Sequence, residues 1–383
     1  MRMTGTEQHP FKVVIVGAGV AGLEAALALR DLAGDRLSLT LLDPAHEFVY
    51  RPQSVREPFA GPLAHRYALA EIAADIGAEL RPEAFKWLDP ENRTVHTEHD
   101  GELQYDALLL ALGARFHAGY EHALTLDVRQ LDKQLQGLVQ DVEGGYAHSV
   151  AFIAPGRMSW PLPLYEIALM TARRAWEMDQ QVTVTLITPE DAPLAVFGPE
   201  VSAAVSKLLD EAGIVTITET RCTTPAANEV VLLPGERKLT VDRVVAMPEL
   251  FGPSTPGLPK DGEHGFITID PHCRVPGVEA VFAAGDATDF YVKYGGLAAA
   301  QADVAAASIA ALAGAPVELR TFNPEIHGIL LGGPRPLYMS AYIAGEHGSA
   351  SAVSDEPTWS PPEKIAARYL SPYLESRDRS GVN

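Results

Sequence analysis

The feature that most constrains this chain is the stretch FKVVIVGAGVAGLEAALAL near its N-terminus. A β-branched run is followed by Gly17, Gly19 and Gly22 in GxGxxG spacing, and then by apolar residues at helical spacing. Gly17 permits a tight turn, Gly19 lets the backbone approach a pyrophosphate, and Gly22 lets the helix pack closely. With Ala18, Val20 and Ala21 between them, these residues predict a dinucleotide site at a helix N-terminus.

The next strand-like run, LSLTLLD, ends at Asp43 and is followed by Pro44. A carboxylate at this distance from the glycine turn accepts hydrogen bonds from the ribose of an adenosine. An acid there favours a free 2′-hydroxyl over a 2′-phosphate. We therefore place Asp43 and Pro44 among the cofactor contacts.

Two later stretches, YDALLLALGA and VEAVFAAGDAT, identify the cofactor by resemblance. They look like the two further FAD motifs of the flavoprotein disulfide reductase superfamily, with Leu112 where a Thr is usual. The resemblance implies FAD binding, with Asp286 bonding the ribitol chain. It places the remaining predicted contacts of these motifs, and one earlier residue, at Phe85, Ala111, Gly113, Ala114 and Gly285.

The order of the motifs implies an α/β protein with two Rossmann-like dinucleotide-binding domains and a small C-terminal α+β segment. A split FAD-binding domain is expected at 11–115 and 241–315. Between its halves, 116–240 is expected to form an inserted NAD(P)-binding-like domain, in which SVAFIAP, a helix over 162–177 and VTVTLITPE repeat the first βαβ pattern. The C-terminal segment is expected at 316–383.

The turn of this second unit, APGRMSWPLPLYE, contains a single glycine. Ser159 and Trp160 block close backbone approach, and Pro161 removes an N–H that could meet a phosphate, so the turn argues against NAD(P)H binding in the usual mode. An atypical nicotinamide site, with Arg157 contacting phosphate, stays an alternative.

SWPLPLYE also resembles the segment of sulfide:quinone oxidoreductases and flavocytochrome sulfide dehydrogenases in which a cysteine precedes a Pro-x-Tyr-Glu helix start. Trp160 occupies the cysteine position, and Cys222 and Cys273 match neither active-site position, so the disulfide relay is lost. Trp160 is either a plug between domains or a wall of the active site. Glu166 is either a proton relay or a first-turn acid of the helix.

Two other stretches resemble the same families. HEFVYRPQSVREPFA matches their extended entry segment and places Arg51 and Pro52 along the cofactor. In YVKYGGLAAAQ, a helix opening at Gly295, Gly296 and Leu297 would direct its N-terminal dipole at the flavin. Lys293 resembles a lysine of sulfide:quinone oxidoreductases that would favour electron acceptance, and its alternative is a solvated surface lysine. Gly-Gly replaces the Ala-Gln pair of type II NADH dehydrogenases, which argues against their quinone site.

Near the C-terminus, 360–374 predicts a short helix with Ile365, Tyr369 and Tyr373 on one face. This face either binds a membrane or docks on the protein's own body, and the nearby glutamates favour docking. A formal charge of −20 argues against nucleic acid partners. No signal peptide, membrane-spanning run or metal-ligand spacing is evident, so we expect a cytoplasmic protein without integral membrane insertion or a metal.

Together these features predict an FAD-dependent oxidoreductase that passes two electrons from a small-molecule donor to a small-molecule acceptor, with a quinone among the candidates. The alternatives are an NAD(P)H dehydrogenase and a non-catalytic FAD-binding interaction protein. The predicted catalytic residues are Lys293, Trp160 and Glu166. A homodimer stays an open alternative.

Overall fold

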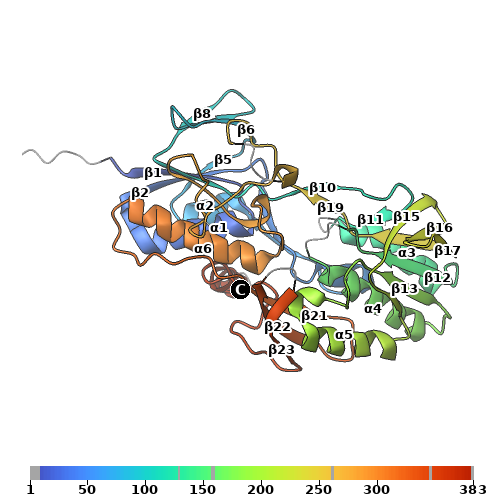
Figure 1. The fold of residues 1–383 in the computed structure, drawn as a ribbon. Helices are drawn as coiled ribbons and strands as arrows, with labels where there is room; N and C mark the ends of the chain where they lie inside the picture. Colours follow the sequence, from blue (N-terminus) through green and yellow to red (C-terminus); the bar gives the residue numbers. More distant parts are fainter. Residues whose placement is uncertain (1–8, 128–129, 157–159, 260–262, 345–346, 381–383) are drawn as a thin grey trace, which may run out of the picture.

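The computed structural model describes residues 9–127, 130–156, 160–259, 263–344 and 347–380. Two α/β units lie side by side, each around a five-stranded sheet, and a C-terminal segment contacts both (Figure 1). The predicted fold class is therefore observed.

The first unit is built on a parallel sheet in the order β20-β9-β1-β2-β5. Both faces of this sheet are covered, which explains why its central strands read as continuous apolar runs. Its strands are β1 (Phe11–Val16), β2 (Leu37–Leu42), β5 (Glu79–Arg81), β9 (Ala107–Leu110) and β20 (Val281–Ala283).

One face of this sheet carries α1 (Val20–Ala33), α2 (Leu69–Asp75) and α6 (Gly295–Leu312). Helices α1 and α6 pack directly against each other, because alanines along both allow close approach. By length and composition α6 could cross a bilayer, but most of it is buried in this core. That burial is typical of the core helix of a globular domain.

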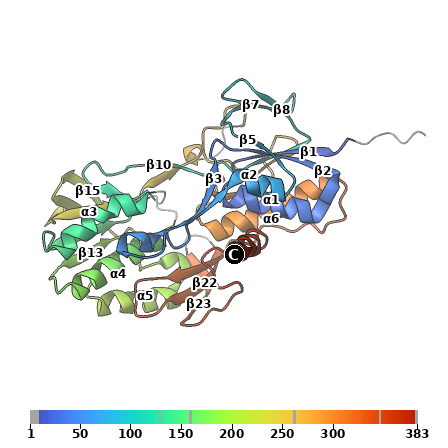
Figure 2. The same ribbon diagram turned by 180° about the vertical axis from the view of Figure 1, so that it is seen from behind.

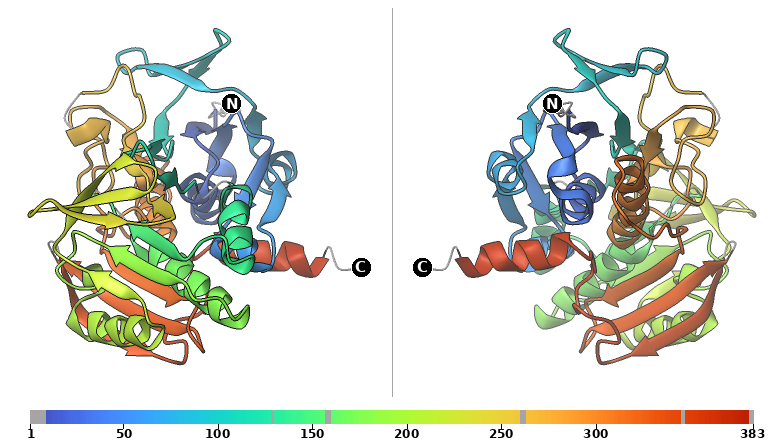
Figure 3. Two further views of the ribbon diagram at one scale, coloured as in Figure 1. Left: turned by 90° about the vertical axis from the view of Figure 1, so that its right-hand side faces the viewer. Right: turned by 90° about the vertical axis from the view of Figure 1, so that its left-hand side faces the viewer.

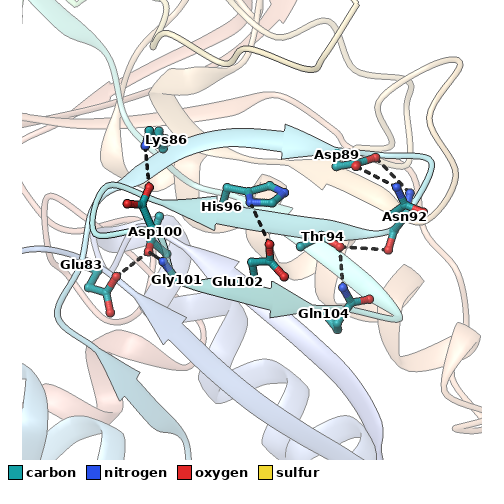
Figure 4. A network of polar contacts seen from close by, with 11 residues as sticks. Glu83, Lys86, Asp89, Asn92, Thr94, His96, Asp100, Gly101, Glu102 and Gln104 are labelled. Atoms are coloured by element: carbon teal, nitrogen blue, oxygen red, sulfur yellow. Dashed lines mark hydrogen bonds and ion pairs between the residues drawn. The ribbon is translucent and has the colours of Figure 1, made fainter.

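The other face of the sheet is covered by an antiparallel meander of β6 (Phe85–Asp89), β7 (Thr94–Thr97) and β8 (Glu102–Gln104). Figure 4 shows its polar contacts, including Lys86 with Asp100 at 3.0 Å and His96 with Glu102 at 3.7 Å. The rings of Trp87 and His96 stack with centroids 3.8 Å apart. Exposed ion pairs of this kind contribute about 0–1 kcal/mol each, so the meander is held mainly by its buried apolar side.

The second unit repeats this plan. Its parallel sheet has the order β11-β18-β12-β13-β14, with helices on one face and an antiparallel meander on the other. The sheet consists of β11 (Leu124–Thr125), β12 (Ser149–Ile153), β13 (Thr183–Ile187), β14 (Val215–Ile217) and β18 (Arg243–Ala246). The helices are α3 (Leu131–Glu143), α4 (Leu162–Glu177) and α5 (Pro199–Glu211), and the meander is β15 (Arg221–Ala226), β16 (Glu229–Leu233) and β17 (Arg237–Thr240). The predicted repeat of the fold and the predicted helix over 162–177 are confirmed.

The predicted boundary at 241 needs a correction, because β18 lies after it yet pairs with β12 in the second sheet. The chain returns to the first unit only after β19 (Glu249–Phe251), which pairs antiparallel with β10 (Arg115–His117). These two short strands form the crossing between the units.

The C-terminal segment first packs on the second unit and then on the first. Its sheet, β21 (Glu325–Leu330), β22 (Leu337–Ala344) and β23 (His347–Ser354), joins the core of the second unit around Phe197. Helix α7 (Leu370–Ser380) docks against α1 and projects beside the first unit (Figure 3). The remaining elements are the hairpin β3 (Glu47–Tyr50) with β4 (His65–Ala68), and short 3-10 turns at Gly34–Arg36, Ser54–Phe59, Ala195–Phe197, Glu263–Gly265 and Gly285–Ala287.

The predicted C-terminal helix is partly wrong, because α7 begins at Leu370 and not in the low 360s. Ile365 and Tyr369 lie before the helix, in the stretch that contains Pro361 and Pro362, where proline disfavours helical continuation. Both side chains, with Tyr373, pack against the core of the first unit. Docking on the protein's own body, the alternative that the sequence favours, is thus observed.

Candidate active site

A cavity of about 510 Å³ lies between the first unit, the start of α4 and the C-terminal segment, and we call it the central cavity. Some of the lining residues that the sequence predicts are far apart along the chain, up to 277 positions for Ala18 and Gly295. The predicted residues that line it are Ala18, Gly19, Val20, Asp43, Arg51, Pro52, Trp160, Glu166, Asp286, Lys293 and Gly295.

The glycine turn after β1 has the geometry of a phosphate-binding turn. Gly17 has φ +101°, and a Cβ there would lie 2.2 Å from the carbonyl oxygen of Ala111. A Cβ on Gly22 would lie 1.8 Å from the carbonyl oxygen of Gly17. A Cβ on Gly19, by contrast, would meet nothing within 4 Å. The space above Gly19, at the N-terminus of α1, is open to receive a phosphate.

Asp43 fixes this turn to the end of β2. Its Oδ2 accepts a hydrogen bond from Ala18 N–H at 2.7 Å, and its Oδ1 accepts one from Ala45 N–H at 2.7 Å. The carboxylate is thereby held at the wall of the central cavity beside the turn. This is the placement that a ribose-binding acid requires.

Gly285 and Asp286 lie where the last strand of the first sheet meets α6. Gly285 has φ +77°, and a Cβ there would lie 3.1 Å from the Cβ of Ala21 and 3.3 Å from that of Ala298. Its N–H donates to Gln301 Oε1 at 2.7 Å, which anchors the turn on α6. Asp286 faces the cavity; removal from bulk water raises its pKa, and nearby Lys293 lowers it in part.

Lys293 is only 7 % exposed, so the alternative of a solvated surface lysine is wrong. Its Nζ donates to the carbonyl of Thr288 and lies 4.0 Å from the centroid of the Phe266 ring. Burial lowers the pKa of Lys293 to about 8, against the opposing effect of Asp286 and Asp289. Lys293 is thus a cation at the cavity wall whose charge depends on pH near neutrality.

The N-terminus of α6 is closely packed. Helix α6 begins at Gly295, as predicted. A Cβ on Gly295 would lie 2.6 Å from Ile365 Cδ1, and one on Gly296 would lie 2.4 Å from the ring of Tyr294. A Cβ at either position would force these side chains to shift, and with glycine the helix N-terminus reaches the cavity at Gly295.

Trp160 lies between the two units and also lines the central cavity. Its position therefore fits both a plug between domains and a wall of the active site. Its ring stacks on Tyr294 of the first unit, with centroids 4.5 Å apart and an interplanar angle of 19°. It is tilted against Phe197 of the second unit at 5.6 Å. Arg157 and Ser159, the other residues considered in this turn, lie outside the described residues.

Glu166 is not a first-turn acid, because it is the fifth residue of α4 and fully buried. Its Oε1 and Oε2 lie 2.6 and 2.8 Å from Nζ of Lys364, and Oε1 also accepts the N–H of Leu331 at 2.9 Å. Burial raises the pKa of Glu166, and Lys364 opposes this shift. The pair forms a buried ionic contact at the cavity wall that joins α4 to the C-terminal segment.

Several predicted cofactor residues support the site without lining the cavity. Ala111 and Gly17 pack on each other. Phe85 is the first residue of β6 in the meander and packs against a separate apolar cluster. The predicted residues outside the described lining are Gly17, Ala21, Gly22, Pro44, Phe85, Ala111, Gly113, Ala114, Gly285, Gly296 and Leu297.

Sequence reasoning missed several residues that the C-terminal half contributes to the cavity wall. Lys364, Ile365 and Tyr294 line the cavity, and so does His327, which the sequence presents as isolated. His327 Nε2 lies 3.3 Å from Glu325 Oε1, and burial lowers its pKa against the effect of that acid. The sequence indicated only that Lys364 belongs to the segment SPPEKIAARYL, for which a helix was predicted. No residue near Lys364 in the sequence indicates that it pairs with Glu166.

In the second unit, the acid that corresponds to Asp43 is turned inward. Glu190 follows β13, but its Oε2 accepts hydrogen bonds from the Tyr165 hydroxyl at 2.6 Å and from Thr188 Oγ1 at 2.9 Å. Burial raises the pKa of Glu190 to about 7. This carboxylate is engaged within the unit rather than presented to a ribose.

Comparison with known proteins places the fold. Residues 11–143 and 166–308 match the family model of the pyridine nucleotide-disulphide oxidoreductases. A sulfide-quinone reductase of Aquifex aeolicus (strain VF5) is 26% identical over 213 residues, covering 52% of this chain and 47% of that protein. The match thus spans about half the length of this curated relative.

Solved structures with the same fold include the sulfide:quinone oxidoreductase of Aquifex aeolicus, with a TM-score of 0.79 at 20% identity over 96% of this chain and 90% of that chain. The ferredoxin reductase for the CYP199A2 system of Rhodopseudomonas palustris has a TM-score of 0.67 at 21% identity, over 87% of this chain and 83% of that one. The gap in the family match, between 143 and 166, contains the Trp160 turn.

Proposed function

The chain belongs to the pyridine nucleotide-disulphide oxidoreductase family, and from this premise we propose that it passes two electrons from a donor bound beside Trp160 to a quinone, without a redox-active disulfide. The predicted family, the two-unit α/β fold, the FAD-dependent oxidoreductase class and FAD as its cofactor are confirmed at the level of the family. The donor and the acceptor belong to the proposal.

The proposal rests on one observation: the turn that can bind a phosphate lies in the same cavity as an aromatic, an acidic and a basic side chain. Gly19 and Asp43 lie at the turn, and Trp160, Glu166 and Lys293 lie on the wall. The open space over Gly19 fits the pyrophosphate of FAD.

When bound, FAD supplies the two-electron redox centre. The N-terminus of α1 would hold its phosphates, and Asp43 would hold its ribose. Asp286 is placed to accept hydrogen bonds from its polyol chain, and the Lys293 ammonium stabilises negative charge that develops in the cavity. The stacked rings of Trp160 and Tyr294 exclude water from the wall.

The pair of Glu166 and Lys364 can hold or release a proton at the cavity wall, which a quinone acceptor requires when it takes up two electrons. A second cavity, of about 250 Å³, adjoins the first and shares Tyr50, Pro52, Ser54, Ile329 and Lys364 with it. We propose that the acceptor approaches through this second cavity. The similarity to a sulfide-quinone reductase of Aquifex aeolicus supports a quinone as the acceptor class.

A thiol relay is not part of the proposal, because the chain has only two cysteines. Cys222 lies in β15 and Cys273 in the core of the first unit, both buried and both outside the cavity lining. Burial raises the pKa of Cys222 to about 11 and that of Cys273 to about 12. Thiols with such pKa values are poor nucleophiles at neutral pH.

The test is anaerobic stopped-flow spectroscopy of the purified flavoprotein. We expect dithionite to bleach the flavin, a soluble quinone analogue to restore its absorbance rapidly, and NADH and NADPH to leave it oxidised. Sulfide is the third candidate donor to mix, because the Aquifex relative is a sulfide-quinone reductase. Rapid bleaching by a nicotinamide would replace the proposal with an NAD(P)H dehydrogenase. A reduced flavin that no quinone reoxidises would indicate a structural role for FAD.

A further inference from the structure

A second polar hollow, of about 390 Å³, lies away from the central cavity and shares no described lining residue with it. Three segments meet there: residues 56–61 of the first unit, the last two turns of α4, and the loop 331–336 between β21 and β22. Figure 2 shows how the segment after β3 crosses from the first unit to lie beside α3 and α4. We call this place the arginine hollow, after Arg56, Arg173, Arg174 and Arg335 in its wall.

The backbone around the arginine hollow is fixed. Gly332 has φ +105°, and a Cβ there would lie 2.9 Å from the Cβ of Leu169, so the loop rests directly on α4. Leu331 N–H donates to the buried Glu166 at 2.9 Å, which secures the start of the loop. On the opposite side, Gly61 N–H donates to the carbonyl of Arg56 at 2.9 Å. The arginines are therefore presented from anchored segments.

The positive charge of the hollow exceeds what local structure explains. Arg173 and Arg174 lie in the last turns of α4, where the helix dipole favours cations, and they pair with Glu177 and Glu143. Neither the helix dipole nor an acidic partner accounts for Arg56, whose side chain donates to the neutral Gln53 Oε1 at 3.3 Å.

Arg335 is equally unexplained, because it reaches Asp355 only at 3.9 Å with both side chains largely exposed. Glu177 is the one acid in the described lining, against four arginines. In a chain with 50 acidic and 30 basic residues, such a concentration of cations is unexpected.

We propose that the arginine hollow binds a diphosphate group, either free pyrophosphate or the diphosphate of a nucleotide. Guanidinium groups bind phosphate oxygens in bidentate geometry. Four arginines in the wall of one hollow match a ligand of about three negative charges better than they match a single carboxylate. Phe59, Met170 and Leu331 add an apolar side to the wall. The same wall would accommodate the organic part of a nucleotide.

The experiment is isothermal titration calorimetry of the FAD-loaded protein with sodium pyrophosphate, ADP and citrate. We expect one saturable site for pyrophosphate and for ADP, weaker binding of citrate, and an affinity that falls as salt rises. Tighter binding of ADP than of pyrophosphate would identify the source as a nucleotide, and the reverse would identify free pyrophosphate.

Two variants at the hollow carry the test. Arg56→Gln and Arg335→Gln should each weaken pyrophosphate binding about 10-fold, because each removes a charge-assisted contact. The matched control is Arg243→Gln, an arginine paired with Asp141 outside the hollow, which should bind as the parent does. Both hollow residues are exposed, so these variants are expected to fold.

The Gly19→Val variant separates this site from the FAD site, because it blocks the glycine turn and leaves the hollow intact. Pyrophosphate binding that survives in Gly19→Val supports the hollow even if the proposed FAD chemistry fails. Binding that disappears in Gly19→Val, citrate binding as tight as that of pyrophosphate, equal weakening in Arg243→Gln, or no saturable heat would each overturn the proposal.

Discussion

Helices α1 and α4 occupy the same place in the two units, each following the central strand of its sheet, and each has a buried glutamate as its fifth residue. Glu24 of α1 accepts the backbone N–H groups of Tyr369 and Leu370 at 2.9 and 2.5 Å. Glu166 of α4 instead binds the Lys364 ammonium. The turns that precede these two helices differ more than the helices do. In the first unit the space over Gly19 is open, whereas in the second unit the indole of Trp160 lies at the turn and stacks on Tyr294.

This difference teaches that a duplicated scaffold can keep its helix positions while its turns diverge in chemistry. In the first unit, the turn is open and the acid after the second strand holds it. In the second unit, the corresponding acid, Glu190, bonds Tyr165 inside the unit. The second unit thus serves as a wall of the central cavity, and the C-terminal segment binds to the buried glutamates of both.

The largest expected effect separates the two buried glutamates. Glu166→Gln leaves the Lys364 ammonium buried without its counter-charge and should lower the free energy of unfolding by about 3–5 kcal/mol. Glu24→Gln keeps an acceptor oxygen for only one of the two backbone N–H donors, and leaving the other unpaired should cost about 1–3 kcal/mol, less than the loss of a counter-charge. Urea denaturation followed by circular dichroism measures both.

The control for this pair is Glu177→Gln, an exposed acid whose ion pairs contribute about 0–1 kcal/mol. The double variant Glu166→Leu with Lys364→Met should regain most of the loss, because apolar residues can replace a buried pair. Equal losses in Glu166→Gln and Glu24→Gln would mean that the two helices are held in the same way.

The second prediction tests the difference between the turns. Gly19→Val places methyl groups in the space that a pyrophosphate needs, and should weaken FAD binding by at least ~100-fold, about 2.7 kcal/mol. Gly19 has φ −80°, so the variant should fold. The matched change in the second turn, Gly156→Ala, meets only the side chain of Arg221 and should retain flavin. The flavin absorbance per protein after purification measures both effects. Loss of flavin from both variants would contradict the assignment of the cofactor to the first turn alone.

The third prediction concerns Lys293 on the side of the first unit. Its pKa of about 8 means that its ammonium is present below pH 8 and lost as the pH rises through that value. A cation near the flavin favours electron uptake, so the midpoint potential of the parent should exceed that of Lys293→Met below pH 8, and the gap should shrink above it. Spectroelectrochemical titration across this range measures the gap, with the exposed Lys207→Met as control. A gap that does not vary with pH would show that Lys293 acts through packing alone.

The smallest expected effect is at Glu190. Its pKa is raised from 4.5 to about 7, so between these values the native state holds a proton that the unfolded chain has released. Stability from this group therefore falls as the pH rises from 4.5 to 7. Glu190→Gln keeps an oxygen for Tyr165 and removes this fall. As the pH rises from 4.5 to 7, the urea midpoint of the parent should fall relative to that of the variant. If the two midpoints change with pH in the same way, Glu190 does not have a raised pKa in the folded protein.

The sequence was most informative where function depends on local geometry. Gly17, Gly19, Gly22 and Asp43 predict a turn, and these residues form it because backbone conformation and strand length are set within a short stretch. The same reasoning predicted the start of α6 at Gly295 and the limits of α4.

It was least informative where contacts join distant segments. The pairing of Glu166 with Lys364 spans 198 positions, and no periodicity encodes it. The boundary at 241 was misplaced because β18 reads as a generic apolar strand whose sheet only tertiary pairing decides. A solvated surface lysine stayed open as the alternative for Lys293, because its contact with Phe266 depends on a loop of the same unit that the local sequence does not reveal.

The C-terminal location of Lys364 and Ile365 has a consequence for how the protein is made. The glycine turn lies far upstream of these two residues of the cavity wall. Domains fold from the N-terminus as the chain emerges from the ribosome. The sheet and helices of the first unit are complete once α6 has been made, and at that point the segment that carries Lys364 and Ile365 has still to follow. We expect cofactor loading to have its widest access in that interval, before this segment closes over the cavity.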